Sequence, residues 1–234
     1  MSIAENLSEV RQRIDVAAHR AKRRPEEIKL MAVSKTFPAE RVREAYDAGQ
    51  RLFGENRVQE FAGKIDALGD LHDADWHLIG HLQTNKAAKA VELFGAIDSV
   101  DSLRLAQKLN AAAQQFRKKL KVLIEINVGG EEAKSGVAPE SRELEDLLVA
   151  APKLDHLEFC GLMTVPPFTD DPFEARPYFQ TLRELRDRIA ARRLPAVDMR
   201  SLSMGMSHDF EVAIEEGSTC VRVGTAIFGD RTKP

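Results

Sequence analysis

Apolar residues recur along the chain in two alternating patterns, one typical of helices and the other typical of strands. Residues 3–23 carry apolar side chains at helical spacing, so a helix is expected before the first strand. Beyond it, short apolar runs alternate with helical segments. The expected strands are residues 28–35, 51–55, 75–81, 96–100, 122–128, 157–165, 200–206 and 219–228, and the expected helices between them are residues 38–48, 57–68, 86–94, 102–117, 139–150, 174–192 and 209–216.

This alternation determines the expected fold class. Strands that alternate with helices form parallel sheets joined by right-handed crossovers, and eight such units in 234 residues suit a closed barrel. An open, doubly wound sheet is the alternative, but it would usually carry a glycine-rich loop after the first strand, where this chain has Thr36-Phe37-Pro38. The sequence therefore predicts one α/β domain over residues 1–234, a (β/α)8 TIM-type barrel with an extra N-terminal helix.

Composition and charge narrow the function classes. The chain is 43% hydrophobic and 30% charged, with a net charge of −3, which is typical of a soluble globular protein and argues against nucleic acid as the main partner. No apolar run is long enough to cross a membrane, and the start of the chain lacks the apolar core of a signal peptide. Cys160 and Cys220 lie inside expected strands and are interpreted as reduced packing residues, so we expect a cytoplasmic protein. Histidine and methionine are too scattered to suggest a metal site.

The first expected strand ends at a lysine. Period-two alternation places Met31, Val33 and Lys35 on one face of that strand. An ammonium group on an apolar face is costly to bury unless it is paired, neutralised or used covalently, and a lysine with a lowered pKa forms Schiff bases with carbonyls. The alternative is that the strand simply ends and Lys35 reaches into water. The barrel favours the functional interpretation, because sites in such barrels lie at the C-terminal ends of the strands.

The last two strands also end in a distinctive way. The segment from Ser203 to Ser207 leads into a helix with Ser207 at or near its cap, and Arg222-Val223-Gly224-Thr225 lies near the end of the eighth strand. Barrels often bind phosphate in these two loops, because small residues expose backbone N–H groups and hydroxyls add donors. The same residue types are also common in ordinary turns.

A lysine on the first strand and a phosphate site at the last two suggest a phosphorylated aldehyde between them. Pyridoxal phosphate (PLP) has both groups. Arg222 shares its strand face with Gly224, so its guanidinium can point into the same cavity. Beside the pyridine nitrogen it would act only as a donor, which leaves the ring a weaker electron sink. Sugar-phosphate aldolases also use a barrel lysine, but its position on the first strand and Arg222 favour PLP.

Six motifs allow a more specific interpretation. They are Ala32-Val33-Ser34-Lys35, Phe53-Gly54-Glu55-Asn56, residues 77–86 (HLIGHLQTNK), Gly161-Leu162-Met163-Thr164, Ser203-Met204-Gly205-Met206-Ser207, and Arg222-Val223-Gly224-Thr225 followed by Ile227-Phe228-Gly229. With these motifs the chain resembles, over nearly its whole length, the pyridoxal phosphate homeostasis protein family, which is related to the N-terminal barrel of alanine racemase.

The resemblance implies roles for particular residues. Lys35 would be the Schiff-base lysine, and Arg222 would face the pyridine nitrogen. The phosphate would be bound by Ser207, Gly224 and Thr225, with Ser203 as a further candidate, and Asn56 would lie beside the ring, although Asn56 can equally serve as a helix cap. The family is regarded as a carrier or regulator of PLP without an established reaction, and mostly as monomeric.

Two functions remain open. One is a monomeric binding protein that holds PLP and releases it, with PLP-dependent apo-enzymes as candidate recipients. The other is an amino-acid racemase or a related fold-type III enzyme. Racemisation needs a second base on the opposite face of the cofactor, which alanine racemases take from a tyrosine of an extra C-terminal domain. This chain ends a few residues after the last expected strand, and Tyr46 and Tyr178 fall within or beside helices. A histidine could substitute, but the carrier is preferred.

Overall fold

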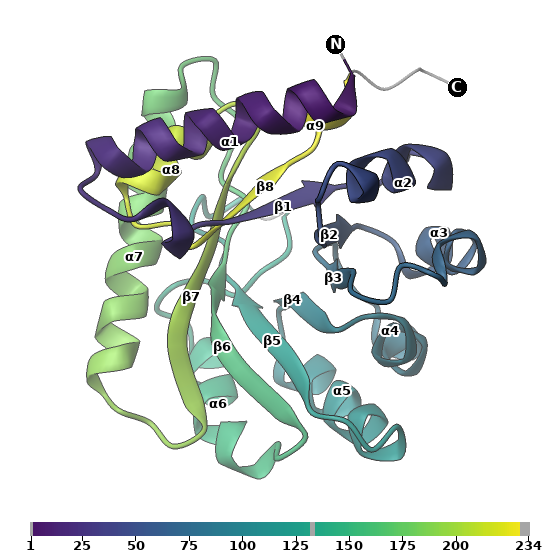
Figure 1. The fold of residues 1–234 in the computed structure, drawn as a ribbon. Coiled ribbons are helices and arrows are strands. Elements are labelled where there is room, and N and C mark those ends of the chain that lie inside the picture. The colour runs from purple at the N-terminus through teal and green to yellow at the C-terminus, as the bar shows by residue number, and fades with distance from the viewer. Residues whose placement is uncertain (1, 132–133, 230–234) are drawn as a thin grey trace.

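The eight strands close into one parallel barrel. The computed structural model describes residues 2–131 and 134–229. The strands are β1 (Lys29–Val33), β2 (Leu52–Glu55), β3 (Asp75–Leu78), β4 (Ala96–Val100), β5 (Leu120–Glu125), β6 (Leu157–Met163), β7 (Val197–Met206) and β8 (Cys220–Val223). Each pairs in parallel with the next along the chain, and β8 pairs with β1 (Figure 1). The predicted barrel is confirmed, and the open sheet is excluded.

Helices surround this barrel. The α-helices are α1 (Ile3–Arg20), α2 (Ala39–Asp47), α3 (Val58–Ala62), α4 (Ala87–Leu93), α5 (Leu103–Gln115), α6 (Arg142–Ala150), α7 (Arg176–Ala191), α8 (Phe210–Glu215) and α9 (Thr225–Phe228). Short 3-10 helices are η1 (Pro25–Glu27), η2 (Ile65–Leu68), η3 (Thr84–Lys86), η4 (Ala151–Lys153) and η5 (Pro172–Ala175). The main core lies between strands and helices, as in the aromatic stack of Phe53, Trp76, Phe61 and Phe94, whose successive ring centroids are 4.8–4.9 Å apart.

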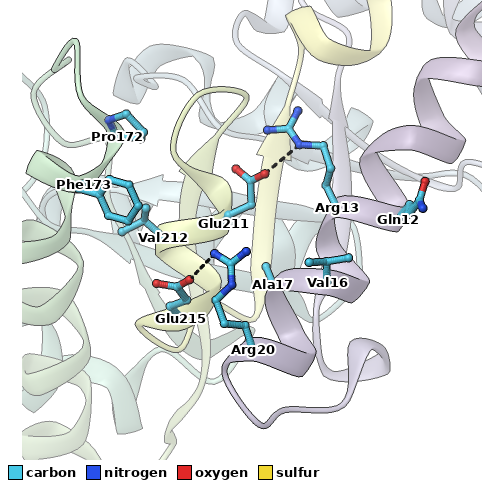
Figure 2. Close-up of a pocket in the computed structure, with 10 residues that line it drawn as sticks. All are labelled: Gln12, Arg13, Val16, Ala17, Arg20, Pro172, Phe173, Glu211, Val212 and Glu215. Carbon is cyan, nitrogen blue, oxygen red and sulfur yellow. Dashed lines mark hydrogen bonds and ion pairs between the residues drawn. The ribbon is translucent and has the colours of Figure 1, made fainter.

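The predicted N-terminal helix is present as α1. Ser2 and Glu5 form a reciprocal capping box at its start, which satisfies two otherwise unpaired backbone N–H groups. Its buried face packs on α8 and α9. A groove of about 470 Å³ runs beside α1, α8 and η5, where Arg13 pairs with Glu211 at 2.8 Å and Arg20 with Glu215 at 3.0 Å (Figure 2). No predicted site residue lines this groove.

Several predicted boundaries are wrong for local reasons. The eighth strand ends at Val223 and not at Phe228, because residues 225–228 turn into α9. The third strand ends at Leu78 and the first at Val33, so both are shorter than predicted, whereas the seventh begins earlier, at Val197. The helix expected over residues 57–68 breaks at Gly63 and Lys64 into α3 and η2.

The predicted single domain over residues 1–234 stays a prediction. Residues 1, 132–133 and 230–234 lie outside the described part of the chain. All the helices and strands named above belong to the barrel and its surrounding layer.

Candidate cofactor site

The C-terminal ends of the strands enclose a cavity of about 680 Å³. That volume is in the range usual for small-molecule sites. Six of the seven predicted site residues line the cavity: Lys35, Asn56, Ser207, Arg222, Gly224 and Thr225. The seventh, Ser203, is fully buried and contacts Arg222 from beneath the cavity. Segments from both ends of the chain therefore converge at one place.

Lys35 lies in a tight turn just beyond β1. Thr36 has a backbone φ of +68°, in the left-handed region that threonine rarely adopts, and its N–H is held by the carboxylate of Glu60. Such conformations cost on the order of 1–3 kcal/mol and cluster at functional sites. The ring of Phe37 stacks on Phe228 at a centroid distance of 4.9 Å, which fixes the turn against α9.

A partly buried lysine, Lys64, holds this turn in place. Lys64 Nζ donates to the backbone carbonyls of Ser34 and Phe37, both at 3.2 Å, and to the Glu55 carboxylate at 2.8 Å. The two carbonyls flank Lys35 in the sequence. Burial raises the pKa of Glu55, although Lys64 and the Ser34 hydroxyl act in the opposite direction. Lys64 was not predicted as a supporting residue, because it lies in a segment that was expected to form one continuous helix. Gly63, where the helix ends, was the signal available in the sequence.

Asn56 follows β2 and faces the cavity without capping a helix. The N-cap of α3 is Arg57, which makes no side-chain capping bond, so the expectation that Asn56 caps this helix is wrong. Its position depends on Gly80 in the next loop. A Cβ atom on Gly80 would lie 2.3 Å from the carbonyl oxygen of Asn56, so only glycine allows the two backbones to approach this closely.

Arg222 is buried at the floor of the cavity and is held in a fixed orientation. Its Nη1 donates to Ser203 Oγ at 2.8 Å and its Nη2 to the carbonyl of Thr164 at 2.6 Å. Desolvation lowers the pKa of the guanidinium, but arginine stays charged in proteins. Ser203 thus orients Arg222.

The loops after β7 and β8 meet through Ser207. Its Oγ accepts hydrogen bonds from the N–H groups of Gly224 at 3.2 Å and Ala226 at 3.4 Å, where α9 begins. Ser207 was expected at or near the cap of the helix over residues 209–216, but the N-cap of α8 is Asp209. Gly205 makes the loop possible, because at its φ of +93° a Cβ atom would lie 2.5 Å from that of Ala213. Backbone N–H groups and two hydroxyls therefore gather at one end of the cavity.

Further titratable groups line the same cavity. Burial, aided by Asp101, raises the pKa of Glu125 to about 7, against the influence of Arg222, and within the described residues its Oε2 has no hydrogen-bond partner. His81 pairs with Asp101 at 3.1 Å, and His208 bonds the carbonyl of Asp170 at 3.0 Å. Tyr46 lies in α2 and Tyr178 in α7, and neither lines the cavity.

Comparison with known proteins identifies the class to which this barrel and its cavity belong. The family model "Alanine racemase, N-terminal domain" matches residues 5–232. Curated relatives named "Pyridoxal phosphate homeostasis protein" include one from Aquifex aeolicus, 48% identical over 99% of each chain, and one from Escherichia coli, 45% identical over 98% of this chain and 97% of the relative. The chain belongs to the pyridoxal phosphate homeostasis protein family.

A solved structure agrees with this assignment. PipY of Synechococcus elongatus, in a structure with PLP bound, is 38% identical and superposes with a TM-score of 0.81 over 97% of this chain and 100% of PipY. Within the residues that the structure describes, no helix is long and apolar enough to cross a membrane. No group of three or more histidine, cysteine, aspartate or glutamate side chains in this part of the chain is arranged to hold a metal.

Proposed function

We propose that this protein binds PLP in the barrel cavity and acts in PLP homeostasis, holding the cofactor and releasing it. One observation carries the proposal: Lys35, Arg222 and the donors around Ser207 line a single cavity. These groups match an aldehyde, a pyridine nitrogen and a phosphate, the three polar parts of PLP. The names of the relatives and the PLP-bound PipY structure support it.

Each residue has a distinct task in this proposal. The amine of Lys35 would condense with the aldehyde of PLP to a Schiff base, with release of one water. Arg222 would donate to the ring nitrogen and Asn56 would lie beside the ring, while Ser203 keeps Arg222 oriented through its 2.8 Å hydrogen bond. PLP supplies an electron-withdrawing ring, and an arginine donor limits that capacity because it does not protonate the nitrogen.

Ser207, Gly224 and Thr225 bind the phosphate in this arrangement. The N–H groups of Gly224 and Ala226 already converge on one oxygen, that of Ser207, so this end of the cavity is built to satisfy an oxygen acceptor. Transfer of PLP to apo-enzymes, a monomeric state and a cytoplasmic location belong to the same proposal.

Replacing Thr225 by valine tests the phosphate assignment. Loss of one charge-assisted hydrogen bond is expected to weaken PLP binding about ten- to a hundred-fold, with little effect on dephosphorylated pyridoxal. Equilibrium titration of both ligands measures the difference. Thr181→Val is the matched control, because the Thr181 hydroxyl donates to the carbonyl of Pro177 in its own helix and Thr181 does not line the cavity. Equal weakening of PLP and pyridoxal binding would show that Thr225 does not bind the phosphate.

The alternative, a racemase or related fold-type III enzyme, is favoured by a different feature of the cavity. His81, His208 and Glu125 also line it, and each is a group able to move a proton. A weak electron sink disfavours removal of an α-proton, so such chemistry would require one of these groups to act as a well-placed base.

Exchange of the α-proton in deuterated water separates the two functions. The PLP-loaded protein is incubated with a panel of amino acids, with free PLP and Lys35→Ala as baselines. The carrier predicts exchange close to that of free PLP. Exchange far above both baselines, at a turnover of about 10 per second, would establish that the protein is an enzyme and not a carrier.

A further inference from the structure

A second cavity, of about 430 Å³, opens at the opposite mouth of the barrel. Its lining includes the first residue of several strands, among them Lys29 of β1, Asp75 of β3, Ala96 of β4 and Cys220 of β8. It therefore lies at the N-terminal ends of the strands, away from the proposed PLP site. No role described above involves it.

Small inward side chains create this cavity. Barrel interiors are normally filled by layers of bulky branched residues. Here Ala96, Ser201, Cys160 and Cys220 occupy lining positions on four different strands. Leu52 and Leu123 line it as well, so part of the wall is apolar.

A charged histidine is built into the wall. His77 Nδ1 lies 3.1 Å from Asp98 Oδ1, and Nε2 lies 3.4 Å from Asp75 Oδ2. Burial opposes the charged ring, but the two carboxylates outweigh it and raise the pKa of His77 to about 10. Only Asp98 of these three residues is buried, because His77 is partly exposed and about half of the Asp75 side chain is exposed. Strongly perturbed groups in a cleft are typical of binding sites.

Among the charged residues that line the cavity, positive side chains outnumber negative ones. Arg23 is paired with Glu27, and Arg200 is paired with both Glu158 and Asp198. Lys29 and Lys121 form no ion pair within the described part of the chain.

These two lysines interact electrostatically with Asp75. The hydrogen bond from His77, and then the charges of Lys121 and Lys29, lower the pKa of that carboxyl. Three cations thus face the two carboxylates of Asp75 and Asp98. The mouth of the cavity therefore favours an anion.

We propose that this cavity binds a small organic anion with an apolar body. Its anionic group lies between Lys29 and Lys121 at the mouth, and its apolar part packs on Leu52, Leu123 and the two thiols. The competing interpretation is a polar layer with a purely structural role.

A titration of the full chain, followed by NMR, tests this site with three probes of one shape: benzoate, benzyl alcohol and benzylamine. Benzoate is expected to shift the His77 ring and Ala96 methyl signals saturably, with benzyl alcohol at least about ten-fold weaker and benzylamine without effect. The response is expected to be the same with and without bound PLP. This readout does not depend on the proposed function.

Lys121→Gln supplies the matched test, with Lys119→Gln as its control. Lys119 is exposed two residues away and does not line the cavity. Lys121→Gln is expected to weaken benzoate binding about ten-fold, and Lys119→Gln to leave it unchanged. Three results would overturn the proposal: no shift with benzoate, an equal response to all three probes, or benzoate that PLP displaces competitively.

Discussion

Lys35→Ala is expected to abolish covalent attachment of PLP while the barrel stays folded. Lys35 lies in a turn beyond β1 and is not part of the hydrophobic core, so its truncation leaves the packing between strands and helices intact. The absorption band of the protein-bound Schiff base should be absent, and borohydride reduction should leave no modified peptide. Far-UV circular dichroism verifies the fold.

Lys134 provides the matched control for this experiment. It is another lysine that lines the cavity, where it bonds Glu131 at 2.9 Å. Lys134→Ala should retain the absorption band, and the reduced adduct of the unmodified protein should map to Lys35. An adduct on Lys134 or Lys86 would refute the assignment.

Lys64→Met should lower the free energy of unfolding by about 3–5 kcal/mol, because it leaves the carboxylate of Glu55 uncompensated in the core. Glu55 is fully buried, and its Oε2 already has no partner in the described residues. Chemical denaturation of the PLP-free protein measures the loss. The same substitution removes the two hydrogen bonds to the turn around Lys35, so PLP binding should weaken as well.

Two further variants separate this effect from general loss of charge. Lys64→Met combined with Glu55→Gln should recover a large part of the stability, since the buried charge is then gone. Lys89→Met breaks the exposed Lys89–Glu92 pair of 2.9 Å and should cost about 1 kcal/mol at most. Equal losses for Lys64→Met and Lys89→Met would contradict the role of the buried pair.

The fold was accessible from the sequence because alternation of apolar patterns is a property of the whole chain. Element ends depend instead on individual contacts. The apolar run through Phe228 continues beyond β8, but Ser207 accepts the N–H groups of Gly224 and Ala226 and the chain turns into α9. That contact joins residues 17 and 19 positions apart, which no local pattern indicates.

That the candidate site residues lie together could be predicted from the fold, because the C-terminal ends of all the strands of a barrel meet at one mouth. The supporting residues did not follow from it. Lys64 reaches the turn around Lys35 from a segment that was predicted to form one continuous helix. Cys160 and Cys220 were interpreted as packing residues, and the cavity that they line was not predicted, because an unfilled interior depends on which side chains face one another across the barrel.

Three pairs of positions, each pair two residues apart in or directly after a strand, line both cavities. The pairs are His77 and Ile79, Leu123 and Glu125, and Cys220 and Arg222. In each pair the first residue lines the cavity at the N-terminal ends of the strands, and the second lines the proposed PLP cavity. One layer of side chains therefore separates the two cavities. The equal response to benzoate that is expected with and without PLP corresponds to a coupling free energy of zero across this layer, so benzoate is in turn expected to leave the affinity for PLP unchanged.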